Sequence, residues 1–369
     1  EELSRIFYLQ PNTISKNFRK IFEKREIAVK KNILVTGGTG YIGSHTAVEL
    51  INAGYGVIIA DNLVNSEIGV LDKIQEITGV RPKFFHADVR DKSALRKIFS
   101  ENDIDGIIHF AGLKAVGESC REPVSYYDNN LISTISLLEV MKEYKVSKFV
   151  FSSSATVYGE PERLPLDEEC SLNPNSPYGR TKLMTEQILK DLYNSDNTLK
   201  IVILRYFNPV GAHVSGLIGE NPKGIPNNLT PYVAKVAAGE LEAVNVFGND
   251  YNTPDGTGVR DYIHVTDLAQ GHVKAMEKIN RSGLYIYNLG TGKGYSVLEV
   301  INAFERACGK KIPVKIAERR AGDIASYYAS PLKAEKELGF KASFSLDDMC
   351  RSLWNFMLKQ KENGSNSNE

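Results

Sequence analysis

The feature that most constrains the fold is a turn of three evenly spaced glycines between an apolar run and a helical segment. The run covers residues 32–36, and Gly37, Gly40 and Gly43 follow it. The first glycine permits a tight exit from a strand, the second lets the backbone approach a pyrophosphate, and the third lets helix and strand pack closely. The spacing therefore predicts a strand, turn and helix that bind a dinucleotide at the helix N-terminus.

An acidic residue after the second expected strand indicates which dinucleotide is bound. Asp61 ends the run at 56–60 and lies 18 residues after Gly43. A carboxylate there can accept hydrogen bonds from an adenosine ribose and would repel a 2′-phosphate, which favours NAD over NADP. The alternative is an ordinary surface aspartate in the turn before Asn62.

Short β-branched runs alternate with helical periodicity along the first part of the chain. Strands are expected at 32–36, 56–60, 106–110 and 201–205, and helices at 44–53 and 93–102. This alternation predicts an α/β fold with a doubly wound parallel sheet, the NAD-binding domain, over residues 32–207. Gly, Pro and Asn then become frequent, so we expect residues 208–358 to form a smaller α/β substrate region whose elements interleave with the first domain.

The two ends of the chain differ from the rest. Residues 1–31 hold eight Lys or Arg against four acids, and Ile14, Phe18, Ile21 and Phe22 form an apolar stripe at helical spacing. A surface helix, or an artefact of the assigned gene start, is the simpler interpretation of this basic extension. A transit peptide or a membrane-surface helix is the alternative. The polar residues 359–369 are expected to form a disordered tail.

Composition excludes several classes of protein. The 369 residues are 42% hydrophobic and 24% charged, which is typical of globular proteins and not of collagen or disordered chains. Equal numbers of basic and acidic residues, 45 each, predict neither nucleic acid nor membrane as a partner. No apolar run approaches the roughly 20 residues of a membrane helix. Four widely separated cysteines favour reduced thiols and a cytoplasmic location, and six histidines without ligand spacing predict no metal site.

A serine-rich strand end and a Tyr-Lys pair carry the chemistry. Residues 149–151 lead into Ser154, and Tyr178 and Lys182 are four apart, so on a helix they share one face. A tyrosine pKa of about 10 falls near an ammonium group and a positively charged nicotinamide, and phenolate then acts as a base. Ser154 could pass the proton. A surface tyrosine over a lysine stem is the alternative, but the dinucleotide turn upstream favours catalysis.

Longer strings resemble the extended short-chain dehydrogenase/reductase superfamily and, within it, the UDP-glucose 4-epimerase family. These strings are residues 37–43, 61–66, 109–119, 152–159, 178–182 and 258–265, and the resemblance covers residues 32 to about 356. It implies an NAD-dependent isomerase of the Rossmann type that interconverts UDP-galactose and UDP-glucose, in galactose metabolism. Hydride would pass from sugar C4 to bound NAD, give a 4-keto sugar, and return to the opposite face.

The resemblance also implies the roles of individual residues. The Tyr178 phenolate would take the proton of the sugar 4-hydroxyl, Lys182 would lower its pKa and anchor the nicotinamide ribose, and Ser154 would bridge Tyr178 and the sugar oxygen. NAD would contact Gly37, Gly40, Tyr41, Ile42, Gly43, Asp61, Asn62, Asn65, Ser66, Asp88, Val89, Phe110, Ala111, Gly112, Lys114, Asn129, Ser152, Tyr178, Lys182 and Tyr206. The UDP-hexose would contact Lys114, Ser154, Tyr178, Asn208, Asn228, Leu229, Phe247, Arg260, Arg320, Asp323 and Tyr327.

Three further expectations follow from the resemblance. Arg260 and Arg320 suit a diphosphate, and Asp323 suits the uridine ribose. Bulky Tyr327 would border the sugar pocket, so UDP-N-acetylhexoses are expected to be poor substrates, unless loop movement makes room. A homodimer is expected through helices near 129–142 and 181–194, whose apolar faces are otherwise ordinary core.

Other activities on this scaffold remain as alternatives. Dehydratases need an acid pair after the strand, and residues 154–156, Ser-Ala-Thr, lack it. A UDP-uronate 4-epimerase or decarboxylase is the enzymatic alternative, and a non-catalytic NAD-binding sensor is the non-enzymatic one.

Overall fold

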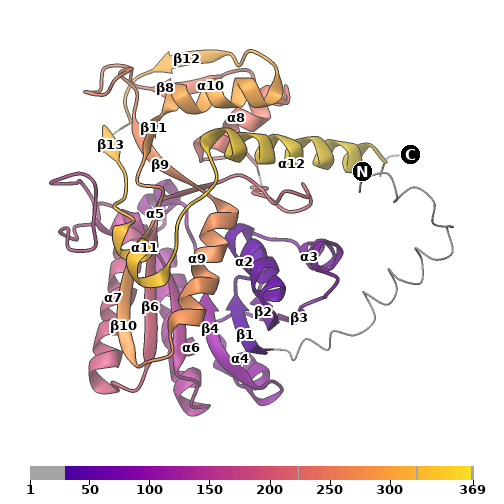
Figure 1. Cartoon of the computed structure of the whole chain (residues 1–369), viewed down its shortest axis with the longest axis vertical. Helices are drawn as coiled ribbons and strands as arrows, with labels where there is room; N and C mark the ends of the chain where they lie inside the picture. Colours follow the sequence, from indigo (N-terminus) through magenta and orange to yellow (C-terminus); the bar gives the residue numbers. More distant parts are fainter. Residues whose placement is uncertain (1–29, 223, 321–322, 367–369) are drawn as a thin grey trace, which may run out of the picture.

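A sheet of seven parallel strands forms the larger part of the molecule (Figure 1). The computed structural model describes residues 30–222, 224–320 and 323–366. In spatial order the strands are β10 (Gly283–Leu289), β6 (Lys200–Tyr206), β5 (Lys148–Ser154), β4 (Ile104–His109), β1 (Lys30–Thr36), β2 (Tyr55–Asp61) and β3 (Lys83–His86). All six pairings are parallel, which confirms the predicted doubly wound α/β sheet.

Helices cover both faces of the sheet. One core packs the sheet against α2 (Tyr41–Asn52), α3 (Val70–Thr78), α9 (Val265–Lys278) and α11 (Leu332–Leu338). The core on the other face includes α4 (Lys92–Ser100), α6 (Pro123–Glu143) and α7 (Pro177–Ser195), while α5 (Val116–Arg121) lies against α6 and α7. Burial on both faces explains why the strands are continuous apolar runs instead of alternating ones.

The second region is built around one central strand. Strand β9 (Val259–His264) pairs with β7 (Asn208–Val210) and β13 (Ser326–Tyr327) in parallel and with β11 (Gly294–Ser296) in antiparallel orientation. Strands β8 (Val244–Phe247) and β12 (Val314–Ala317) form a separate pair. Helices α8 (Leu229–Ala237), α10 (Val297–Cys308) and α12 (Leu346–Asn366) pack beside them around a third core. Elements from the second half of the chain also complete the large sheet, since β10 is one of its strands and α9 and α11 pack against it.

Local signals in the sequence begin and end several of these helices. Asp91 caps α4 by accepting from the backbone of residues 93 and 94. Ser296 and Glu299 form a capping box at the start of α10, and Gly309 ends that helix in the left-handed conformation. These caps satisfy backbone groups that the helices themselves leave unpaired.

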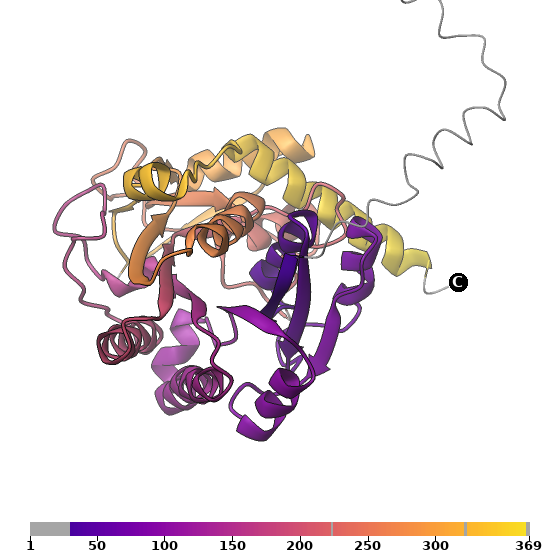
Figure 2. The ribbon, with the colours of Figure 1, turned by 60° about the horizontal axis from the view of Figure 1, so that its bottom comes forward.

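The C-terminal prediction is wrong for residues 359–366. Helix α12 continues through this polar segment to Asn366, and Figures 1 and 2 show it extending past the rest of the second region. The Nζ of Lys361 donates to the carbonyl of Ala238 after α8 at 2.7 Å, which fastens the extended helix to its neighbour. Tertiary contact thus overrides the polar composition.

Of the expectations for the N-terminal part of the chain, the structure tests only the start of the first strand. The apolar stripe at residues 14–22 lies outside the described residues. Strand β1 begins at Lys30, two residues before the expected start, because Lys30 already pairs with Tyr55 of β2. Within the described ranges, no helix is both long enough and apolar enough to cross a membrane.

Candidate functional site

The glycine turn makes an open cradle at the N-terminus of α2. Gly37 has a φ of 71°, and a Cβ there would lie 2.8 Å from the backbone nitrogen of Ala111. A Cβ on Gly43 would lie 2.3 Å from the carbonyl oxygen of Gly37. Gly40 caps α2 without a side-chain hydrogen bond, and the first turn carries no acid. The first N–H groups of the helix are therefore free of side-chain partners and suit an anionic phosphate.

Asp61 is buried and held beside this turn. Its carboxylate accepts from the backbone of Thr39 at 3.2 Å, the backbone of Leu63 at 2.9 Å and the hydroxyl of Ser66 at 3.0 Å. The Thr39 and Ser66 hydroxyls also bond each other at 2.8 Å. This is not an ordinary surface aspartate, and its position at the end of β2 suits a ribose. Asn65 is exposed in the same loop.

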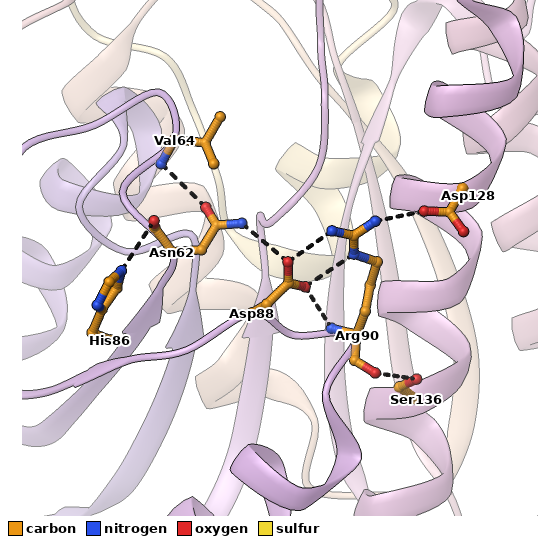
Figure 3. A network of polar contacts seen from close by, with 7 residues as sticks. All are labelled: Asn62, Val64, His86, Asp88, Arg90, Asp128 and Ser136. Atoms are coloured by element: carbon orange, nitrogen blue, oxygen red, sulfur yellow. Dashed lines mark hydrogen bonds and ion pairs between the residues drawn. The ribbon is translucent and has the colours of Figure 1, made fainter.

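A polar network lies next to Asp61 and is shown in Figure 3. Asn62 donates to the carboxylate of Asp88 at 3.4 Å. The Arg90 guanidinium donates to both oxygens of Asp88 at 3.1 and 2.9 Å and to Asp128 of α6 at 2.5 Å. Arg90 holds the pKa of the Asp88 carboxyl below its usual value. The predicted NAD residue Asp88 and, through it, Asn62 are thus connected to an arginine that the sequence did not single out.

The loop after β4 continues the cradle. The backbone N–H of Phe110 donates to the carbonyl of Thr36 at 3.0 Å, so the loop that begins at Phe110 lies beside the end of β1. Lys114 reaches from this loop to Glu220 of the second region at 3.1 Å, and Glu220 also accepts from Asn228 at 3.1 Å. One carboxylate therefore brings the predicted residues Lys114 and Asn228 together, although 114 residues separate them in the chain.

Tyr178, Lys182 and Ser154 meet at the end of β5, as their spacing predicted. Ser176 caps α7 by accepting from the backbone of residue 179, which places Tyr178 in the first turn. Ser154 hydrogen-bonds to the buried Tyr178 side chain. The Lys182 Nζ donates to the carbonyl of Ser152 at 2.7 Å and lies 5.8 Å from the centre of the Tyr178 ring.

Burial sets the protonation of these groups differently from the sequence-based expectation. Burial raises the pKa of Tyr178 to about 12, although the hydrogen bond from Ser154 opposes the rise. Burial also lowers the pKa of Lys182 to about 8, and the negative charge of Glu186 opposes that fall. The protein's own groups therefore do not make Tyr178 a phenolate near pH 7. A further positive charge beside the ring is required, which a nicotinamide can supply.

Tyr206 lies next to these residues at the end of β6. Its hydroxyl hydrogen-bonds the hydroxyl of Ser152, and its ring centre is 5.8 Å from that of His272. The His272 ring in turn lies 4.7 Å from the ring of Phe110. Aromatic residues from three elements thus form the floor beside the catalytic group.

The predicted sugar-nucleotide residues of the second region form one cluster. The Asp323 carboxylate accepts from Arg260 at 2.8 Å and from Arg320 at 3.0 Å. The Arg320 guanidinium lies over the ring of Phe247, 4.8 Å from its centre. Two guanidiniums and a half-exposed aromatic ring suit a nucleoside diphosphate.

Tyr327 connects this cluster with the catalytic group. It pairs with Arg260 in the β13–β9 register, and its hydroxyl donates to the carbonyl of Ala155 at 2.5 Å. The Tyr327 ring packs against Phe207, with 5.6 Å between ring centres. Because Ala155 directly follows Ser154, Tyr327 lies close to the group formed by Ser154, Tyr178 and Lys182.

The remaining predicted residues occupy the same edge with fewer contacts. Tyr41 donates from its hydroxyl to the carbonyl of Gly211 at 2.7 Å, so it links α2 to the second region. Val89 is buried after β3, Ile42, Asn129 and Leu229 are half-buried, and Asn208 is exposed in β7.

Two buried acids escaped the sequence analysis besides Arg90 and Glu220. Asp261 accepts from residues 291, 292 and 329 at 2.6 to 3.2 Å and so joins β9 to the segment after β13. The sequence feature that could have identified Asp261 is its position directly after Arg260. Glu186 lies one turn after Lys182, and an acid on a buried helical face is the signal that could have found it. Among the described residues no group of three or more potential ligands could hold a metal.

Comparison with known proteins agrees with this site. Residues 34–353 match a family model described as GDP-mannose 4,6 dehydratase. The UDP-glucose 4-epimerase of Bacillus subtilis is 59% identical over 87% of this chain and 95% of its own length, and that of Dictyostelium discoideum is 55% identical over 88% and 95%. A solved structure of the Bifidobacterium longum UDP-glucose 4-epimerase with NAD+ and UDP has a TM-score of 0.87 and 58% identity, covering 89% of this chain and 99% of that one.

The Arg90 network generates a first prediction. Replacing Arg90 with Gln frees the Asp88 carboxylate, and we expect NAD to bind up to about fivefold more weakly, since a partly exposed ion pair contributes up to about 1 kcal/mol. Calorimetric titration of NAD into cofactor-free protein measures this. Arg96→Gln is the matched control, because Arg96 makes a similar two-bond pair with Glu143. Equal NAD affinity in the two variants would contradict the role of Arg90.

Proposed function

The chain belongs to the UDP-glucose 4-epimerase family, and from this premise we propose how its residues interconvert UDP-galactose and UDP-glucose. One observation carries the proposal. Ser154, Tyr178 and Lys182 meet at the carboxyl edge of the sheet, beside a glycine cradle with an open helix N-terminus. The relatives with 54–59% identity are named as epimerases, so the uronate and sensor alternatives are not favoured.

The residues of the cradle fit NAD. Side chains at Gly37 or Gly43 would collide with the backbone of Ala111 or of Gly37, so these glycines keep the turn tight and the helix N-terminus close to β1, and Asp61 presents a carboxylate suited to the ribose. Asp88 and Asn62 would contact the adenine end, and Lys182 the nicotinamide ribose. When bound, NAD accepts hydride from sugar C4 and returns it to the opposite face.

Tyr178 is the base and then the acid of the proposed reaction. Its phenolate takes the proton of the 4-hydroxyl as the 4-keto sugar forms, and its hydroxyl returns the proton after the sugar turns over. Ser154 holds the sugar oxygen next to Tyr178. Lys182 places a positive charge 5.8 Å from the centre of the Tyr178 ring, and an opposite charge at that distance favours the phenolate.

Arg260 and Arg320 hold the diphosphate of the sugar nucleotide while the sugar rotates. Both now pair with Asp323, so the diphosphate would share these guanidiniums with the carboxylate. Asp323 then accepts from the uridine ribose, and Phe247 borders the nucleoside. An acid pair for dehydration is absent after β5, where residues 154–156 read Ser-Ala-Thr.

A cytoplasmic homodimer completes the proposal. All four cysteines are free, which supports a reducing compartment. Val124, Ile132 and Ile135 of α6 and Met184 of α7 are exposed, and the two helices pack side by side. An apolar face of this kind supports a contact with a second copy of the chain.

Substitution of Tyr178 by Phe tests the mechanism. We expect kcat to fall by about 100- to 10,000-fold, because a general acid–base group is lost, while the protein keeps its NAD. Proton NMR follows UDP-glucose formation from UDP-galactose without added nucleotide. The parent protein should convert the substrate with its resident NAD. Undiminished turnover by the variant would show the mechanism to be wrong.

Tyr327 provides a test of substrate range. We expect Tyr327→Cys to gain activity on UDP-N-acetylglucosamine, because the smaller side chain makes room for an acetamido group. Tyr327→Phe keeps the bulk and loses only the hydrogen bond to Ala155, so it should gain nothing. Tyr328→Cys is the control, because Tyr328 directly follows β13 and its ring lies next to Gly294. A cysteine variant at 327 without the gain argues against the steric border.

The dimer has its own prediction. Ile132→Asp should halve the molar mass measured by light scattering during gel filtration, because a charge would be buried at the contact. Leu332→Asp places the same change on the exposed surface of α11 and should leave the mass unchanged. A parent protein that runs as a monomer would refute the proposal.

A further inference from the structure

Glu186 is a fully buried carboxylate directly behind the catalytic group. It lies on α7, four residues after Lys182 and eight after Tyr178. Its exposed fraction is 0%, and that of its partner Arg205 is 1%. A charge pair so completely removed from water is unfavourable unless its hydrogen bonds are complete.

The hydrogen bonds of Glu186 reach two other elements. Its Oε1 accepts from the Ser153 hydroxyl at 2.6 Å and from Nε of Arg205 at 3.0 Å. Its Oε2 accepts from the second guanidinium nitrogen at 2.6 Å. One side chain of α7 is thereby bonded to both β5 and β6.

The two partners are immediate neighbours of site residues. Side chains alternate along a strand, so Ser153 points away from the side occupied by Ser152 and Ser154. Through Ser153, Glu186 therefore holds the end of β5 from the face of the strand opposite to Ser154. Arg205 stands in the same relation to Tyr206. Moving either partner would displace the adjoining residue.

The network is fixed on its far side as well. The other guanidinium nitrogen of Arg205 donates to the Tyr158 hydroxyl at 3.1 Å, and Tyr158 donates to Asn288 of β10 at 2.7 Å. Asn288 in turn donates to the carbonyl of Leu166 at 3.0 Å. Arg205 is therefore held by neighbours other than Glu186, which makes it a rigid support.

We propose that Glu186 is a positioning residue of the epimerase reaction, which fixes the distance between α7 and the ends of β5 and β6. The contact of Lys182 with the Ser152 carbonyl and the contact of Tyr178 with Ser154 both depend on this distance. The inference rests on the proposed function, since it assigns Glu186 to that same site. A displacement of about 1 Å in such a group can lower the rate by about 100-fold.

Two variants separate positioning from simple support of the fold. Ser153→Ala removes the attachment of β5 and leaves the ion pair intact. Glu186→Gln keeps the shape and removes the charge, and if it fails to fold, Ser153→Ala still carries the test. Ser133→Ala is the matched control, because this buried serine on α6 bonds only the carbonyl of Asn130 among the contacts described.

The first readout is turnover per NAD-loaded site. For Ser153→Ala we expect kcat for UDP-galactose to fall about tenfold with KM within about twofold, and a larger fall for Glu186→Gln. The double variant should be no slower than Glu186→Gln alone, because both changes break one connection. Ser133→Ala should keep the parent kcat. Parent-like kcat in both site variants, or effects that simply multiply, would overturn the proposal.

The second readout does not require epimerase activity. The phenolate absorbance of Tyr178 is taken in the NAD-loaded protein as the difference from the same protein with Tyr178→Phe. Ser153→Ala changes no charge, but it should raise the pKa of Tyr178 by loosening the bond from Ser154. The groups facing Tyr178 are Lys182 on α7, Tyr126 on α6 and Tyr206 on β6, and all stay unchanged. An unshifted pKa would overturn the inference, whereas a parent protein inactive on UDP-galactose would overturn only the proposed function.

Discussion

Parallel strands all end at the same edge of their sheet, and this constraint determines where the groups of the cofactor cradle and of the catalytic site lie. Gly37, Asp61, Ser154 and Tyr206 each stand at or directly after the end of a strand. They are far apart in the chain, yet the hydrogen-bonding register brings them to one line. The glycine turn adds a second restriction on this edge. The carbonyl of Gly37 lies so near Gly43 that no side chain fits between them. The cofactor cradle is thus a direct consequence of packing α2 tightly against β1 and β2.

Burial at that edge disfavours the charged forms of both Lys182 and Tyr178, and different groups oppose the two effects. Burial lowers the pKa of Lys182 to about 8 and raises that of Tyr178 to about 12, so water exclusion opposes both charged forms. At pH 7 Lys182 is protonated, and holding this buried charge lowers the free energy of unfolding. The penalty disappears above the ordinary lysine pKa of about 10.4, where the side chain is neutral in both the folded and the unfolded chain. The resident acid Glu186 opposes the first shift. The hydrogen bond from Ser154 opposes the second, and a cationic ring beside Tyr178 would oppose it further. Cofactor binding and base strength are then coupled, which suits an enzyme that keeps its NAD.

The sequence predicted which residues form the site better than it predicted which of them contact each other. The strands and the Tyr178–Lys182 face were predictable, because their information lies in periodicity and spacing over a few residues. The contact of Lys114 with Glu220 was not, because it depends on the path of a long loop between two regions. The same holds for Arg90 with Asp128 and for the sharing of Asp323 by two arginines. The helix at 359–366 was missed for a related reason, since the contact that supports it comes from α8.

The two regions of the molecule are connected at the catalytic group itself, and this has a consequence for catalysis. Asp261 holds the segment after β13, and Tyr327 of β13 reaches across to Ala155 beside Ser154. Under the proposed function, a sugar nucleotide that binds Arg260 would act on the same strands that carry Tyr327 towards Ala155. On the other side, Glu186 fixes Ser153 behind Ser154. The end of β5 is thus held between the ion pair of Glu186 with Arg205 and the second region. In the proposed reaction, binding energy from the diphosphate would then orient the sugar without displacing the base.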